Sequence, residues 1–516
     1  MAKISPLTQK IIKDFSREKK SSKKKSDYFV RIERTPRNSV FRNKMIEKGE
    51  KGEKRALRRK VVVFFLRKRL FSKDLLQTNP KSNARLLFAE IISRGYLSKN
   101  KIKNLKFQKV SAVLEKYSYL LRHSPDQRMG FKWWIIEVAS CELEEVIWSA
   151  KEEKIFTSYM ARYLMEEAEI ESSSKKINST FLFRISSKKA IFKGVDLPVF
   201  SYYFIKNKYP FWSEASEKDL EKVITTISED KEDIEKEFRG TAYKKVFLFC
   251  KKNTLPFLAI KDLFNQNSKK IKSLLSDPQE VEKEVKKIYE EKKKEVEKTI
   301  YLSTTTLAFF LFIFNFSFFN FTVNNFDALI GVFLLPFLVL LLTVSTSLPL
   351  DKNKNKLLLK VIDIVYKKEN KEKRKISLKK HKKSVVFAIN MFYSLFFVVL
   401  IALFIFILFI VEMKTSNSFV FFFLLLLSSF LMVKIRKKVK DLFVIEKKEK
   451  ITEVALDALS FPLIKVEKAL EINEKKCHPA FIITEALIKM RKKDIVDLFN
   501  NWKLKLKQKK EKIYEI

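Results

Sequence analysis

One stretch of the sequence, from Lys298 to Lys352, restricts what this chain can fold into more than any other part. Between these two lysines the only charged residues are two aspartates. A helix needs about 20 apolar residues to cross the hydrocarbon core of a bilayer, and this stretch is more than twice as long. Polar residues at 322–327, "TVNNFD", lie midway, where a turn belongs. The sequence therefore predicts two membrane-spanning helices, over 300–321 and 328–349.

A second apolar pair follows the first. Residues 385–411 form one run, "KTSNS" interrupts it, and 419–433 form the next run. The last run is short, and it spans only if its ends extend or the bilayer thins locally; an interfacial or re-entrant position is the alternative. Core helices of water-soluble proteins usually have a polar face, and these runs have almost none. We therefore expect two transmembrane hairpins, four helices in all.

The basic residues indicate an orientation, because lysine and arginine in short loops stay on the inner side of a membrane. The loop 351–384 holds 14 Lys and Arg against 4 Asp and Glu, whereas "TVNNFD" holds no basic residue. We expect a multi-pass protein of the cytoplasmic membrane, or of an organellar inner membrane, with both termini inside. Anionic lipid head groups are the expected membrane partner. Residues 1–20 contain no apolar run, so no cleavable secretory signal is expected.

The fold class that these patterns predict is mainly α. It combines the four-helix transmembrane region with a large helical N-terminal cytosolic domain and a small helical C-terminal cytosolic region. The expected segments are a basic disordered arm (1–55), a helical cytosolic domain (56–276), a charged helix leading into the membrane (277–299), transmembrane hairpin 1 (300–349), a basic cytosolic loop (350–384), transmembrane hairpin 2 (385–435) and an amphipathic helical C-terminal region (436–516).

Basic residues dominate the N-terminal part of the chain. Residues 1–70 carry 24 Lys and Arg against 7 Asp and Glu, and low-complexity runs in the first 55 predict poor order. The apolar centre of "RRKVVVFFLRKRLF", Val61 to Leu66, is too short to span a membrane. It is either a core element, which is the commoner case, or an interfacial helix with basic flanks.

Local signals place several helices in the cytosolic domain. "NARLLFAEIISRG" has helical apolar spacing, and Gly95 is its expected C-terminal cap. Further along, Asp277 is the expected N-cap of a charged helix, Pro278 its first residue, and Glu280 the partner that completes a capping box. Nothing breaks this helix before residue 300, so we predict one long helix that continues into the first span.

Two acidic stretches follow the basic arm in sequence. Ile135 to Ser172 contain 10 Glu against 3 Lys and Arg, and Trp212 to Phe238 contain 10 Asp and Glu against 4 Lys. Either stretch can dock the basic arm within the same chain or recruit a basic partner; a solvated helix face is the alternative. The aromatic segment 201–216 includes Lys206 and Lys208 and can stack nucleic-acid bases, but core packing with a turn at Pro210 is favoured.

Motifs of catalysis and metal binding are missing from the sequence. The three histidines, His123, His381 and His478, have no helical metal-ligand spacing, and the three cysteines lie far apart. With 7 glycines the chain has no classical phosphate-binding loop. The glutamates between 166 and 171 have no histidine nearby and are not assigned to a metal. We therefore assign no catalytic, cofactor-binding or metal-binding residue, and we expect no cofactor.

The function that fits these observations is a non-catalytic multi-pass membrane scaffold or assembly factor that recruits protein partners at the cytosolic membrane face. Its spans hold no charged residue, unlike those of most transporters, and Asn390 and Ser394 share a helix face that suits packing. One alternative is a membrane-bound enzyme or transporter component with an unrecognised site. The other is a membrane-tethered nucleic-acid or ribosome binder; it is less favoured because the Lys and Phe bias matches AT-rich codons.

Overall fold

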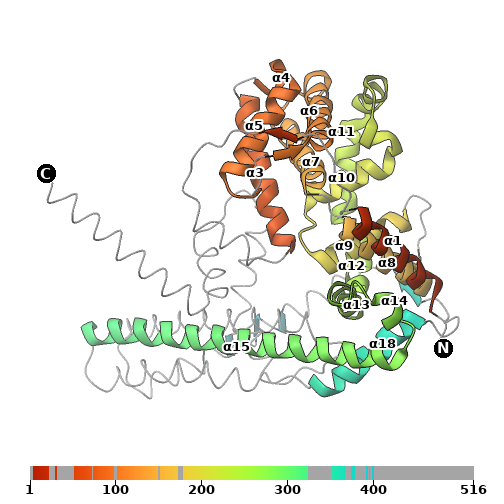
Figure 1. The fold of residues 1–516 in the computed structure, drawn as a ribbon. Coiled ribbons are helices and arrows are strands. Elements are labelled where there is room, and N and C mark those ends of the chain that lie inside the picture. The colour runs from red at the N-terminus through yellow and green to blue at the C-terminus, as the bar shows by residue number, and fades with distance from the viewer. Residues whose placement is uncertain are drawn as a thin grey trace. The chain divides into compact units, whose positions relative to one another are not determined.

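Figure 1 shows the computed structural model of the chain. It describes residues 4–21, 29–31, 51–71, 74–97, 101–148, 151–171, 178–322, 350–366, 374–377 and a few positions between 391 and 402. These residues are mainly helical, as predicted. The chain divides into two units, which are described separately. The first unit comprises Met1–Glu282 and Leu359–Lys380, and the second comprises Lys283–Leu358 and His381–Ile516.

The first half of the first unit is built around one central helix, α7, which packs against α3, α6 and α10. The sequence of α7, "MGFKWWIIEVASCELEEVI", has almost no continuous polar face, so neighbouring helices cover it on several sides. The helices of this half are α3 (Lys51–Phe71), α4 (Asp74–Gln77), α5 (Pro80–Ser93), α6 (Asn104–His123) and α7 (Met129–Ile147).

In the second half of the unit, α9 packs between α8 and α12. Its core is aromatic, with Phe183, Phe200, Trp212 and Phe257 fully buried. The elements are α8 (Lys151–Glu167), α9 (Ser179–Phe192), α10 (Leu197–Lys208), the 3-10 helix η1 (Pro210–Glu214), α11 (Glu217–Arg239), α12 (Thr241–Lys252), α13 (Thr254–Gln266) and α14 (Ile271–Leu274).

Side-chain caps explain where several of these helices begin. Asn79 accepts a hydrogen bond from the N–H of Lys81 at the start of α5, and Asp196 accepts one from Val199 at the start of α10. Ser216 and Asp219 form a reciprocal capping box on α11. The chain leaves α5 through Gly95, whose φ of 77° suits glycine best. The sequence therefore predicted the end of α5 correctly.

Two short sheets join distant segments of the first unit. Strand β1 (Phe29–Arg31) pairs antiparallel with β2 (Lys101–Lys103), so that Val30 is opposite Ile102. Strand β3 (Ala168–Glu171) pairs parallel with β4 (Arg374–Ser377), with Ile170 opposite Ile376. The second sheet ties the end of α8 to the segment that was predicted as a basic loop.

The expectation of a disordered arm over 1–55 does not hold for its first residues. Residues Pro6–Ser21 form helix α1, which packs on α8. Phe15 is buried, and its ring meets those of Phe156 and Phe264 at centroid distances of 6.1 and 5.4 Å. Burial of Ile11, Ile12 and Phe15 on one side of a short helix offsets the entropy of ordering it.

The long charged helix predicted from residue 277 onward is present as α15 (Pro278–Thr322), 45 residues without a break. The Asp277 side chain accepts a hydrogen bond from the backbone N–H of Gln279 at 2.9 Å, as expected of an N-cap. The thin apolar stripe is buried at Val281, Val285 and Ile288. Within the second unit, Lys354 of helix α18 (Leu350–Tyr366) donates a hydrogen bond to Glu290 of α15 at 2.7 Å.

The predicted four-helix transmembrane region is wrong for the part of the chain that the structure describes. None of the described helices combines the length and the apolar character that a membrane crossing requires. Residues 300–321 belong to α15, whose first half alternates Glu and Lys and whose second half includes Ser303, three successive threonines, Asn315 and Asn320. The apolar run therefore shares one continuous helix with a highly charged first half.

The predicted location, a multi-pass membrane protein with both termini inside, is corrected by the same finding. The predicted spans at 328–349 and 419–433 lie outside the described residues, as does nearly all of 385–411, including Asn390. The predicted C-terminal region, 436–516, also lies outside them.

Candidate functional site

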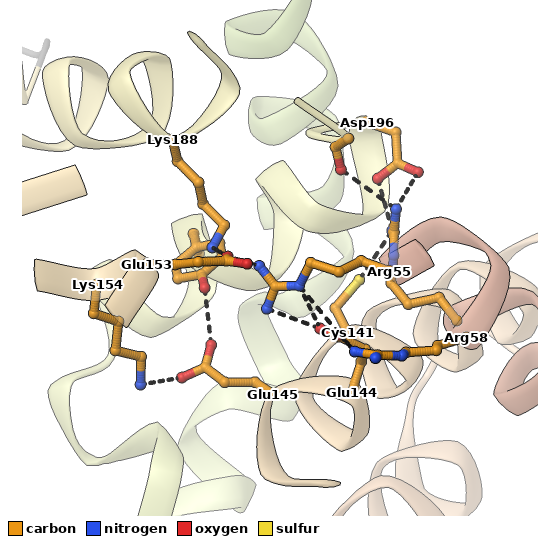
Figure 2. Close-up of polar contacts among 12 residues, drawn as sticks. Arg55, Arg58, Cys141, Glu144, Glu145, Glu153, Lys154, Lys188 and Asp196 are labelled. Atoms are coloured by element: carbon orange, nitrogen blue, oxygen red, sulfur yellow. Dashed lines mark hydrogen bonds and ion pairs between the residues drawn. The ribbon is translucent and has the colours of Figure 1, made fainter. Parts of the chain in front are cut away.

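A cluster of charged side chains, four of them buried, lies where α3, α7, α8, α9 and α10 meet, and Figure 2 shows its polar contacts. The helix α7 places Glu144 and Glu145 at its buried C-terminal end, and α8 adds Glu153 near its start. Carboxylates are rarely buried unless they are paired. We call the group the charge cluster; its members are Arg55, Arg58, Glu144, Glu145, Glu153, Lys154, Lys188 and Lys206.

Arg55 of α3 links the two acidic helices. Its Nε donates to both carboxylate oxygens of Glu144, at 3.1 and 3.0 Å, and its Nη1 donates to Glu153. A guanidinium suits this place, because its planar fork donates in several directions at once. Arg58, one turn further along α3, lies 3.9 Å from Glu144 and stacks over the ring of Trp148 at 4.9 Å.

Glu145 collects three donors on the other side of α7. Lys154 forms an ion pair with it, Lys206 lies 3.4 Å away, and the hydroxyl of Tyr203 donates to it at 2.9 Å. Burial alone raises the pKa of a carboxyl group, but the two lysines and the hydroxyl outweigh burial and hold the pKa of Glu145 at about 2. Glu145 is therefore ionised at neutral pH.

Lys188 of α9 is the weakly compensated member of the cluster. Its ammonium lies 3.6 Å from Glu153 and 4.9 Å from the ring centre of Tyr203. Burial, together with the charge of Arg55, lowers the pKa of Lys188 from 10.5 to about 8, although the three glutamates oppose the change. The cluster as defined holds five cations and three carboxylates, so its net charge is positive when every member is ionised.

A second contact set borders the cluster. Arg59 of α3 binds Asp196 with two hydrogen bonds of 2.8 Å each, and its Nη1 lies 3.5 Å from the sulfur of Cys141. Burial raises the pKa of the Cys141 thiol to about 12, and Arg59 only partly offsets this. The Cys250 thiol is also buried, and its pKa is likewise raised to about 12. Both thiols are therefore protonated at neutral pH and poor nucleophiles.

A third buried network joins α6, α7 and η1. Lys116 donates to Glu142 and to the backbone carbonyl of Trp212, both at 2.7 Å. Tyr117 and the indole N–H of Trp212 both donate to the second oxygen of Glu142, at 2.9 and 3.0 Å. Both charges are thus hydrogen-bonded, which limits the cost of their burial. This network fixes Trp212 in the core.

The contacts of the cluster join helices of the first unit to one another. Each of its carboxylates is held by cations, and the described cysteines carry protonated thiols. Among the described ranges of the chain, no group of three or more His, Cys, Asp or Glu is placed to hold a metal ion. The described histidine, His123, has its Nδ1 2.9 Å from the carbonyl of Tyr119 on its own helix. His381, His478 and Cys477 lie outside the described residues.

The sequence predicted part of this arrangement. For the first acidic stretch, 135–172, docking of the basic arm within the chain was one of three alternatives, and Arg55, the last residue of that arm, binds Glu144 and Glu153. In the second stretch Asp230 is buried and paired with Lys208, whereas Glu217, Glu221 and Glu229 of α11 are exposed. The aromatic segment 201–216 forms core and a turn, as favoured.

No site residue was predicted, and the sequence carried one signal that was missed. Glutamates at 142, 144 and 145 interrupt an apolar helix without forming a polar face, which predicts buried and paired carboxylates. Lys188, Arg59 and Asp196 carry no such local signal. Comparison of the chain with protein-family models, with curated proteins and with solved structures found no match.

Proposed function

We propose that this protein is a non-catalytic helical scaffold that recruits protein partners. The observation that carries the proposal is the two-sided character of α3. Its inner side is fixed in the first unit, while its outer side exposes Leu57, Phe64 and Phe71. A fixed helix that exposes large apolar side chains in a row is typical of a protein-binding surface.

The inner side of α3 is held by apolar contacts and by ion pairs. Val61, Val62, Phe65 and Leu66 are buried. At the start of the helix, Arg55 and Arg59 bind Glu144 and Asp196, and in its second half Arg67 binds Glu137 at 2.7 Å. A helix anchored in this way presents its outer side chains in fixed positions, which lowers the entropy cost of binding a partner.

The charge cluster supports the non-catalytic part of the proposal. A general acid or base needs a pKa near the working pH and access to a substrate. Lys188 meets the first condition, but it is enclosed by Tyr203 and Glu153. Its location suits a role in holding α9 against α8.

Photo-crosslinking in living cells tests this function. The residue p-benzoylphenylalanine is introduced into the full chain at Phe64, and in a matched control at Leu248 of α12, which is 54% exposed. We expect discrete protein adducts from position 64 and none of the same adducts from position 248. The same residue is also introduced at Leu57 and Phe71, and absence of protein adducts from all three positions would contradict the proposal.

A second measurement separates a scaffold from an enzyme whose site is the charge cluster. The variant Lys188→Met removes the one amine of the cluster with a pKa near neutrality and leaves α3 unchanged. For a scaffold we expect the same adducts at position 64 and normal cell growth. Normal protein levels with lost cellular function would favour an enzyme instead.

A further inference from the structure

The exposed apolar residues of α3 lie in one regular row. Leu57, Phe64 and Phe71 are spaced seven residues apart, and they are 39%, 55% and 66% exposed. Seven residues make almost two helical turns, with a drift of about 20° per heptad, so the three side chains share one stripe. At 1.5 Å per residue the row is about 21 Å long. We call these three residues the α3 row.

The spaces between the three apolar residues are occupied by lysines. Lys60 and Lys68 are exposed and lie within four residues of Phe64 on either side of it in sequence, hence on the same face. The aliphatic stems of such exposed lysines extend an apolar surface. The guanidinium of Arg94 lies 4.9 Å from the ring centre of Phe64, and its charge is paired with Glu90 of α5.

We propose that the α3 row binds an acidic amphipathic helix of a partner protein. This inference rests on the proposed function and names the class of partner. A helix with apolar residues at successive a and d positions packs side by side on such a row. Glutamates or aspartates that flank the seam would meet Lys60 and Lys68, so charge complementarity selects an acidic helix over a basic one.

The geometry disfavours a second copy of the same row as the occupant. Two copies of α3 packed through this face would bring the lysines at 60 and 68 close to the same lysines of the other chain. Opposed like charges cost binding free energy. An acidic helix removes that repulsion and replaces it with attraction, which a self-complementary pairing of this row cannot do.

The width of the row disfavours two other occupants. A helix that lies on a membrane buries a broad apolar face, whereas here Val61, Val62, Phe65 and Leu66 already face the core and leave a stripe one residue wide. Duplex nucleic acid requires a continuous basic surface along its phosphates, whereas lysines alternate with apolar residues here. A partner helix can cover such a narrow stripe with its own apolar face.

Peptide binding to the full chain tests the inference. The probe is a fluorescent three-heptad helix with leucine at a and d and glutamate at the flanking e and g positions; its glutamates also suppress its self-association. One control peptide replaces every glutamate with lysine, and another keeps the composition but scrambles the heptad. Fluorescence anisotropy should give micromolar binding of the acidic peptide, because three anchors bury less than a standard interface. We expect the two controls to bind at least about tenfold more weakly.

Charge reversal provides the sharper test. Phe64→Glu should weaken binding of the acidic peptide about tenfold or more. The double variant Lys60→Glu with Lys68→Glu should bind the lysine peptide more tightly than the acidic one. Matched control variants on α12 are Leu248→Glu and the pair Lys244→Glu with Lys252→Glu, all exposed positions; these should leave binding unchanged. All substituted residues are exposed, and circular dichroism with thermal melting verifies the fold of each variant.

The outcomes distinguish this inference from the proposed function. If protein adducts form at position 64 but the acidic peptide does not bind selectively, the scaffold proposal stands and the acidic-helix inference fails. Tighter binding of anionic lipid vesicles or of heparin than of the peptide, lost in Phe64→Glu, also overturns it. If adducts and peptide binding are both absent, both proposals fail.

Discussion

Arg59 and Asp196 form a two-pronged ion pair between α3 and the start of α10, with both nitrogen-to-oxygen distances at 2.8 Å. Asp196 also accepts the N–H of Val199 as the N-cap of α10. The Asp196 carboxylate therefore both caps the start of α10 and binds Arg59 of α3. This double use couples the position of α3 to the packing of the aromatic half of the first unit.

The first prediction concerns this pair. Arg59→Met should lower the free energy of unfolding by about 1–3 kcal/mol, a range reduced because the Asp196 side chain is 38% exposed. Urea denaturation measures the change. Arg128→Met is the control: Arg128 pairs with Asp126 on the surface, and the denaturation midpoint should not move.

A companion pair of variants separates the two roles of Asp196. Asp196→Asn removes the charge but keeps a capping side chain, whereas Asp196→Ala removes both. The alanine variant should be less stable than the asparagine variant by about 1 kcal/mol, the usual contribution of an N-cap. Equal stability of the two variants would show that the cap contributes nothing here.

Because the pKa of Lys188 is lowered in the folded chain, we predict that Lys188 makes the free energy of unfolding rise with pH. Its pKa in the folded chain is about 8, against 10.5 for an ordinary lysine. Between these two values the unfolded chain holds a proton that the folded chain has released, so alkaline pH favours folding. Below about pH 8 both states are protonated and this contribution is constant.

The measurement is the free energy of unfolding of wild type and of Lys188→Met, from urea denaturation between about pH 7 and pH 9.5. The difference in favour of wild type should grow by about 1–2 kcal/mol over this range. The buried thiols of Cys141 and Cys250, whose raised pKa values lower the stability of both proteins as the pH rises, cancel in this difference. Higher pH is avoided because burial raises the pKa of Tyr203, so folding becomes less favourable once tyrosines of the unfolded chain ionise. Lys154→Met, at a more exposed lysine, should show the same pH dependence as wild type. Parallel curves for wild type and Lys188→Met would contradict the prediction.

The third prediction is that the buried thiols resist modification. With pKa values of about 12, Cys141 and Cys250 are thiolates only to about one part in ten thousand at pH 8. In a Cys477→Ser variant, which removes the cysteine outside the described residues, iodoacetamide should label the folded chain slowly. Unfolding in urea should expose both thiols, and mass spectrometry should then find two labels. Rapid labelling of either cysteine in the folded chain would contradict its burial.

Local rules predicted the features of this protein that depend on neighbouring residues in sequence. Gly95 after α5, Asp277 and Pro278 at the start of α15, and the core role of 201–216 all follow from caps, turns and apolar spacing. The transmembrane region was predicted from apolar runs alone, and no described helix combines the length and apolar character of a membrane crossing.

The charge cluster depends on tertiary packing, which local rules do not reach. Lys188 lies in "ISSKKAIF", where nothing distinguishes it from Lys189. Its burial comes from the helices that α9 packs against. Arg59 and Asp196 are 137 residues apart, and no sequence period connects them. The glutamates of α7 were visible as an anomaly, but their partners were not.

The last prediction concerns α1, which lies in the segment that was expected to be disordered. Ser5 donates its N–H to the carbonyl of Val365 at 2.9 Å, and Thr8 shares a hydrogen bond with Tyr159 at 2.8 Å. These contacts satisfy a carbonyl at the end of α18 and bind α1 to α8, while Phe15 fills an aromatic pocket. Phe15→Ala should therefore lower the free energy of unfolding by about 2–4 kcal/mol. Lys13→Ala, at an exposed position of the same helix, should leave it unchanged. Chemical denaturation followed by tryptophan fluorescence measures both, and equal midpoints for Phe15→Ala and wild type would mean that α1 does not pack on α8 in solution.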